Sequence, residues 1–177
     1  MIATREPSQE YHEALGEFIE FFAIVEQTVF DALQAISGVS DATARAIFNG
    51  THTSDGMNLL KRVAEANPNF KHEKQLEIMA IHLKAITDVR NDLVHYGSTF
   101  SPNGEQVLTR ARRAFRPEKL PPPKRISSRK LRFMTEDLAM IASFLIFWSA
   151  RQLENVAPQE DQKNADDLKR SWKYRPA

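Results

Sequence analysis

Apolar residues recur at intervals of three and four positions through most of the chain, a spacing that predicts helices. The longest such stretch begins after Ser8, a suitable N-cap, and ends before Gly38, the kind of residue that commonly follows a helix C-terminus. Three more helices are expected at residues 40–48, at 54–66 and from 69 or 70 to 96, each ended by a Gly- or Pro-containing pair or by a Gly.

The pattern changes after Gly97. Residues 100–108 read as a strand, an Asn103-Gly104 turn and a second strand. Residues 117–130 are rich in Pro, Lys and Arg, so we expect a loop or an extended arm there. Thr135 can cap a last helix that reaches about Asn155. Residues 157–177 are polar, and we expect a flexible tail or one ordered only by a partner.

Separate apolar stripes cannot be buried alone, so the helices must pack against one another. We therefore expect an all-α fold: an antiparallel bundle of four to five helices with a small β-hairpin and a basic arm inserted before the last helix. At 177 residues the chain suits one domain, over residues 8–156 with the insertion at 98–132.

The composition excludes several classes of protein. There are no cysteines, which excludes a disulfide scaffold and thiolate metal sites. The apolar stretch Leu138–Ala150 is shorter than the roughly 20 residues of a membrane span, so it fits a buried helix. The N-terminal residues lack the apolar core of a signal peptide. We expect a cytoplasmic protein with no membrane association and, given the absence of His and carboxylate spacings typical of metal sites, no metal or cofactor.

Charge is distributed unevenly along the chain. The formal net charge is only +1, but residues 110–132, which we call the basic arm, hold ten Lys and Arg against one acidic residue, Glu118. Their local charge is +9, which leaves −8 on the rest of the chain. Such a segment suits a polyanion, and the nearby Phe115 and Phe133 could stack on bases. A solvated loop, or a clamp on the acidic remainder of the protein, is the alternative. The candidate nucleic-acid-binding residues are Arg110, Arg112, Arg113, Arg116, Lys124, Arg125, Arg129 and Lys130.

Two charged residues fall inside apolar stripes. At 100° per residue, Glu26 lies about 20° from Leu15, near the centre of the first stripe. Arg90 lies inside the stripe of the fourth helix by the same arithmetic. A buried charge without a partner is costly, so we expect a Glu26–Arg90 ion pair between the two helices. Such a pair could be a purely structural clasp that sets the helix register.

His95 follows Arg90 by five positions, near the end of the fourth helix, and Asn91 shares its helix face. Histidine titrates near neutrality, which suits general acid–base chemistry, although a lone His at a helix end is often only a favourable cap contact. The run Arg90-Asn91-x-x-x-His95 resembles the HEPN superfamily, whose members include bacterial toxins and defence ribonucleases and also non-catalytic domains. The resemblance spans residues 8–97 and the final helix.

The resemblance implies metal-independent endoribonuclease activity that leaves a 2′,3′-cyclic phosphate at a homodimer interface. His95 would transfer the proton, Arg90 would stabilise the phosphate, Asn91 would orient either, and Glu26 would hold Arg90. Because about 140° of helix separates Arg90 from His95, a composite of two chains, or a distorted helix end, is needed. A non-catalytic interaction module and an RNA binder that uses the arm stay open, as does an antitoxin or other protein partner.

Overall fold

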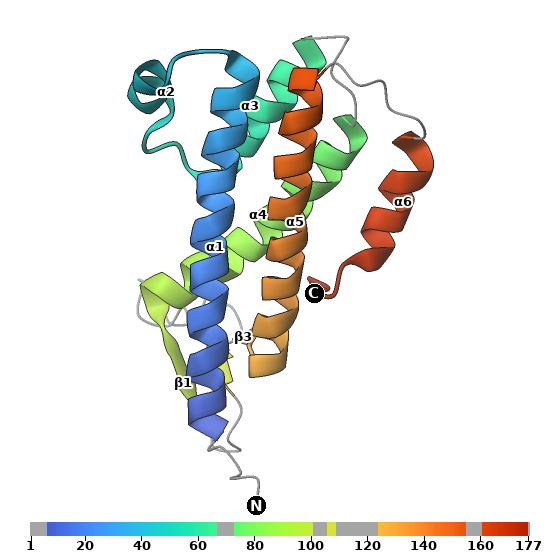
Figure 1. Ribbon diagram of the computed structural model, residues 1–177. Coiled ribbons are helices and arrows are strands. Elements are labelled where there is room, and N and C mark those ends of the chain that lie inside the picture. Colours follow the sequence, from blue (N-terminus) through green and yellow to red (C-terminus); the bar gives the residue numbers. More distant parts are fainter. Residues whose placement is uncertain (1–6, 67–72, 101–105, 109–123, 155–160, 177) are drawn as a thin grey trace, which may run out of the picture.

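The structure, a computed structural model, describes residues 7–66, 73–100, 106–108, 124–154 and 161–176. In these segments the chain forms six helices and three short strands, which confirms the all-α class (Figure 1). The elements are α1 (Pro7–Ser37), α2 (Asp41–Phe48), α3 (Thr53–Ala66), α4 (Glu73–Tyr96), β1 (Ser98–Phe100), β2 (Gln106–Leu108), β3 (Lys124–Arg125), α5 (Ser128–Glu154) and α6 (Asp161–Ser171).

The two longest helices, α1 and α5, lie side by side and run in the same direction, whereas α4 runs in the opposite direction (Figure 1). The α1–α5 pair therefore departs from the antiparallel packing that the sequence predicted. The first turns of the two helices are in contact, since Glu10 of α1 accepts a hydrogen bond from Ser128 at 3.4 Å and pairs with Arg132 at 3.5 Å. Helices α3 and α4 pack against each other as consecutive elements, and α3 also contacts α1.

The apolar stripes meet in one core, as the sequence predicts. Phe18, Phe22 and Val25 of α1 are buried with side chains of the other helices. Helix α4 contributes Leu76, Met79, Leu83 and Ile86, and helix α5 contributes Leu131, Met134, Leu138, Ile141, Leu145 and Trp148.

Helix ends are close to the sequence expectations. Ser40 caps α2 by accepting a hydrogen bond from the Thr43 N–H, and Gly38 takes a positive φ of 65° after α1. Helix α3 lies close to α1 at Gly56, where a Cβ atom would lie 2.5 Å from Cγ1 of Val29. Only glycine therefore fits this crossing without movement of a neighbour.

Helix α5 starts at Ser128, seven residues before the predicted Thr135 cap. Ser127 is the residue that caps it, since its hydroxyl accepts a hydrogen bond from the Lys130 N–H at 3.2 Å. Its first turns carry the basic residues that we assigned to the arm, with Leu131 directed into the core. By length and composition alone, Ser128–Ala150 would suffice to cross a membrane, a test that the core helix of a soluble protein also passes.

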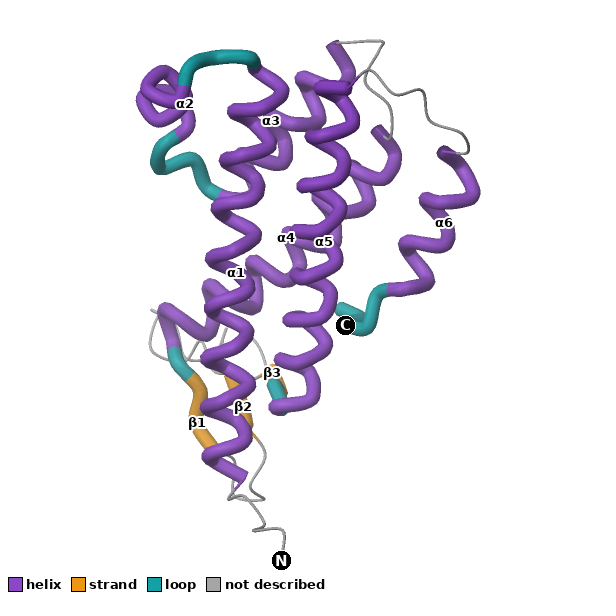
Figure 2. Tube along the Cα trace, viewed as in Figure 1, coloured by secondary structure: helices purple, strands orange, loops and turns teal. Residues whose placement is uncertain are grey.

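The three strands form a small antiparallel sheet at the end of α4 (Figure 2). Thr99 pairs with Val107, as expected for a hairpin, and Val107 pairs in turn with Arg125 of β3. The predicted Asn103-Gly104 turn lies outside the described residues. Strand β3 was predicted only as part of an extended arm.

The C-terminal segment differs from the flexible tail that we expected. Residues 161–171 form α6, which packs beside α4, and Trp172 and Tyr174 are buried.

Asp137 of α5, fully buried, accepts hydrogen bonds from the backbone N–H groups of Lys173 and Tyr174, both at 2.8 Å. His82 of α4 lies 3.0 Å from the same carboxylate, and its ring stacks on Trp172 at 4.2 Å. We call His82, Asp137, Trp172 and Tyr174 the C-terminal clasp.

Candidate functional site

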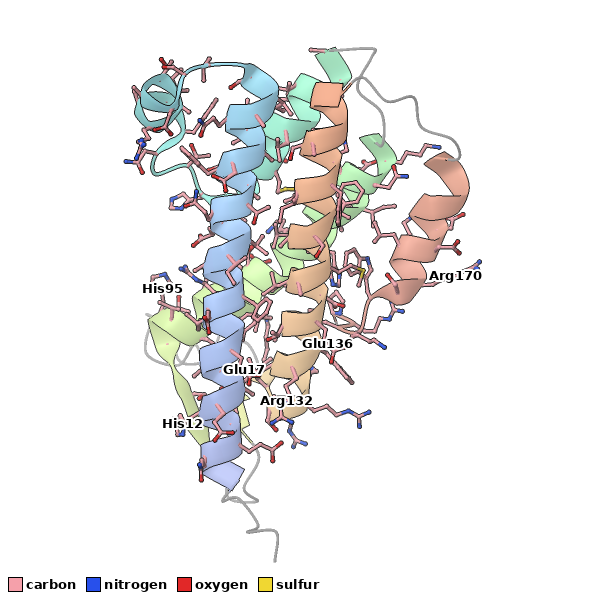
Figure 3. The ribbon with its side chains drawn as sticks, viewed as in Figure 1. His12, Glu17, His95, Arg132, Glu136 and Arg170 are labelled. Carbon is pink, nitrogen blue, oxygen red and sulfur yellow. The ribbon has the colours of Figure 1, made fainter. Side chains whose placement is uncertain are left out.

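The residues that carry the HEPN resemblance lie on the last two turns of α4. The helix ends because Gly97 adopts a positive φ of 64° and its N–H returns to the Leu93 carbonyl at 2.9 Å. This end of α4 lies beside α1 and leads directly into the sheet, and Figure 3 shows His95 there. The sequence therefore predicted the place of the motif correctly, at the end of a long helix.

Arg90 is half-buried against α1. Its guanidinium carbon lies 5.1 Å from the centre of the Phe22 ring, a cation–π distance, and its Nη1 donates to Oδ1 of Asn91 at 3.2 Å. The Nε atom is buried without a hydrogen-bond partner. No carboxylate of the described residues pairs with this guanidinium, so its charge is held in place by a ring and an amide.

The predicted Glu26–Arg90 pair is wrong. Glu26 instead accepts a hydrogen bond from the Thr53 hydroxyl at 2.9 Å, and no ion pair joins it to Arg90. The helical arithmetic correctly gave the side of α1 on which Glu26 lies, but not the neighbour that covers each turn. The Phe22 turn of α1 meets α4, whereas the next turn, at Glu26, meets the start of α3.

His95 is exposed, and its ring centre lies 6.4 Å from that of Tyr96. Neither Asn91 nor Arg90 forms a hydrogen bond with it, so Asn91 positions Arg90 within the chain and does not orient His95. Val94, between them in sequence, leaves 54% of its surface exposed. One chain thus presents Arg90 and His95 on the same helix end without bringing them together.

The basic arm reaches this helix end through its last residues. Lys124 pairs with Asp92 of α4 at 3.3 Å, two positions after Arg90. Arg125 is exposed, Lys130 is half-buried, and the Arg129 guanidinium lies 5.2 Å from the Phe133 ring. The remaining candidate nucleic-acid-binding residues, Arg110, Arg112, Arg113 and Arg116, lie outside the described residues.

A buried His–carboxylate pair is the feature that sequence reasoning missed. Neither His82 nor Asp137 was singled out from the sequence. Asp137 is three positions from Met134 and four from Ile141. The stripe argument that identified Glu26 would have identified Asp137 as well. Because backbone N–H groups and His82 occupy both carboxylate oxygens, the pair is a structural clasp that closes the C-terminus onto α4 and α5.

Within the segments that the structure describes, no group of three or more His, Asp or Glu side chains is placed to hold a metal ion. No family model, curated protein or solved structure matches the chain. The HEPN resemblance therefore depends on the residues of α4 themselves.

Proposed function

We propose that this protein is an HEPN-like, metal-independent endoribonuclease of toxin or phage-defence type that acts at the carboxyl end of α4. The observation that best supports the proposal is the surroundings of the Arg90 guanidinium. Its guanidinium is fixed against Phe22 and Asn91, and no carboxylate of the described chain neutralises it. A fixed cation at a surface is what a phosphate undergoing substitution requires.

The chemistry follows from the two side chains. His95 accepts the proton of a ribose 2′-OH while the 2′-oxygen attacks the adjacent phosphorus. The bond from phosphorus to the 5′-oxygen breaks, and that oxygen takes up a proton from water as it leaves, while His95 gives the proton it accepted back to the solvent. Arg90 stabilises the negative charge that develops on the phosphate oxygens. The products are a 2′,3′-cyclic phosphate and a free 5′-hydroxyl, and no metal takes part.

A homodimer completes the proposed site. Since Arg90 and His95 do not meet within one chain, a second α4 end has to bring its own pair to the same phosphate. The exposed side chain of Val94 beside His95 supports an apolar contact at this position. A stable interface of this kind should bury roughly 1,000 Å² or more in total, with His95 near the two-fold axis.

The basic arm is proposed to supply the affinity for RNA. Lys124 places the end of the arm next to Asp92, close in sequence to Arg90. If the arm binds phosphates, the affinity for RNA should fall steeply with salt. Replacement of Arg110, Arg112 and Arg113 by Gln should flatten that dependence, whereas an unchanged dependence would leave the arm as a solvated loop.

The decisive experiment is incubation of the purified protein with labelled RNAs, tRNAs included, in EDTA, followed by analysis of the cleaved ends. We expect 2′,3′-cyclic phosphates, and His95→Ala should lower the rate by about 10²-fold or more while leaving RNA affinity unchanged. His12→Ala is the matched control, because His12 is an exposed histidine on the second turn of α1 and not on α4 (Figure 3).

Arg90→Ala is a suitable second variant, because removal of the guanidinium leaves no buried carboxylate without its partner. Cleavage that requires added metal, or that survives His95→Ala, would contradict the mechanism. Binding of RNA without cleavage would favour an RNA-binding role, and a dimer without RNA affinity would favour a non-catalytic interaction module.

A further inference from the structure

A cavity of about 470 Å³ lies between α1 and the loop that joins α2 to α3, drawn in teal in Figure 2. Its apolar wall consists of Val29, Phe30, Leu33 and Phe48. Its polar side carries Glu26 and Gln27 of α1 and residues 49–53 of the loop and the start of α3. The volume is within the range of small-molecule sites, and the surface that lines the cavity is somewhat more polar than apolar.

The charge of the cavity is carried by Glu26. The residues that line it include one carboxylate, one histidine (His52) and neither Lys nor Arg. Oε1 of Glu26 accepts a hydrogen bond from Thr53, while Oε2 has no partner among the described residues. A half-buried carboxylate with one unused oxygen, between a polar loop and the apolar side of the cavity, favours a cationic partner.

The neighbouring amide adds a second acceptor. Nε2 of Gln27 donates to Asp31 at 2.7 Å, an orientation that leaves the carbonyl oxygen of Gln27 as the group available to a ligand. Two acceptors on adjacent residues suit a donor with several N–H groups.

We propose that this cavity binds an organic cation, a guanidinium or ammonium group on an apolar stem, with Glu26 as its counter-ion. The cation could belong to a free amine or to an Arg or Lys side chain of a protein partner, since both present the same group. A phosphate is disfavoured, because the lining residues offer a carboxylate and no Lys or Arg. The site is therefore distinct from Arg90 and does not rest on the proposed ribonuclease activity.

Titration calorimetry with agmatine and benzylamine tests the proposal, with benzyl alcohol as the neutral counterpart of benzylamine. We expect benzylamine to bind about tenfold or more tightly than benzyl alcohol, and Glu26→Gln to remove this difference. Glu20→Gln, an exposed carboxylate on α1 outside the cavity, should leave binding unchanged.

Ala23→Lys gives a second variant that should not disturb folding, because Ala23 is an exposed residue of the cavity rim. A lysine there lies three positions from Glu26 and should compete with the added cation, which lowers affinity. A short peptide with an internal Arg distinguishes the two sources: binding as tight as that of agmatine points to a partner side chain, and weaker binding points to a free amine. Equal binding of benzylamine and benzyl alcohol, unchanged affinity in Glu26→Gln, or no binding at up to about 10 mM would overturn the proposal.

Discussion

The Asp137 carboxylate and the backbone N–H of Tyr174 form a buried 2.8 Å hydrogen bond that fastens the C-terminal segment to α5. The neighbouring Lys173 N–H and the His82 ring complete the set of donors, so a residue with no exposed surface has its acceptors satisfied. A fully buried carboxylate is tolerated only when hydrogen-bond donors satisfy its oxygens, so the stability of the clasp depends on these donors together.

Asp137→Asn should therefore destabilise the protein by about 2 kcal/mol or more, because an amide group would face backbone donors that need an acceptor. Denaturant unfolding measures the change. Lys173→Ala is the matched control: the contact uses the backbone of Lys173 and its side chain is exposed, so the change should stay within about 0.5 kcal/mol. If Asp137→Asn were as stable as the parent, the clasp would have no energetic role.

The crossing of α1 and α3 gives a second prediction. Gly56→Ala should cost about 1–3 kcal/mol, because the added Cβ meets the buried Val29 side chain at 2.5 Å. Gly16 lies in the exposed interior of α1, where an added Cβ would meet nothing within 4 Å beyond its own helix turn and chain neighbours, and Gly16→Ala should stabilise by about 0.5–1 kcal/mol. The same substitution thus has opposite signs at two helical positions. Thermal unfolding of both variants compares them, and destabilisation by Gly16→Ala would contradict this account.

A double-mutant cycle tests the separation of Glu26 from Arg90. With no contact between the two side chains, the coupling energy of Glu26→Ala and Arg90→Ala should be below about 0.5 kcal/mol. A buried ion pair would instead make loss of either partner cost about 3–5 kcal/mol. Glu26 and Thr53, hydrogen-bonded at 2.9 Å, provide the positive control, with an expected coupling of about 1 kcal/mol.

Alkaline pH should weaken the fold through two tyrosines. Burial raises the pKa of Tyr11, and burial and the charge of Asp88 raise the pKa of Tyr174. Each folded-state phenol therefore keeps its proton at a pH where the unfolded one has lost it. Their contribution is constant below about pH 10 and decreases as pH rises above it.

An ultraviolet titration of tyrosinate measures this effect. The component that ionises above about pH 10 should shrink in Tyr11→Phe and again in Tyr174→Phe. Both tyrosines ionising at or below pH 10 in the folded protein would contradict the burial that the structure gives them.

Local signals predicted most of the fold, and contacts between distant segments account for the differences. The first four helices have apolar stripes and caps such as Ser40, which depend only on neighbouring residues, so their bounds were close. The start of α5 was placed too late because its basic first turn resembles the preceding arm. The clasp joins residues more than 30 positions apart, and no local pattern in a polar tail indicates that Asp137 holds it.

The candidate site shows the same division. The position of Arg90 and His95 at a helix end followed from spacing and from Gly97. The partner of Arg90 could not be predicted in this way. A helical-wheel analysis of one helix does not show how the neighbouring helix is rotated against it. Phe22, a buried residue of the core, is the group beneath the guanidinium.

The parallel arrangement of α1 and α5 has an electrostatic consequence, because it places the positive ends of two helix dipoles at the same end of the protein. Helix α5 has no acidic residue in its first turn. Glu10 of α1 contacts both Ser128 and Arg132, so one carboxylate on a neighbouring helix serves both N-termini. Glu10→Gln should destabilise by a few tenths of a kcal/mol to about 1 kcal/mol, more at low salt than at high salt since the pair is partly exposed. Glu17→Gln, beyond the first turn of α1, should show no such salt dependence, and equal effects of the two variants would mean that the two helix ends need no shared counter-charge.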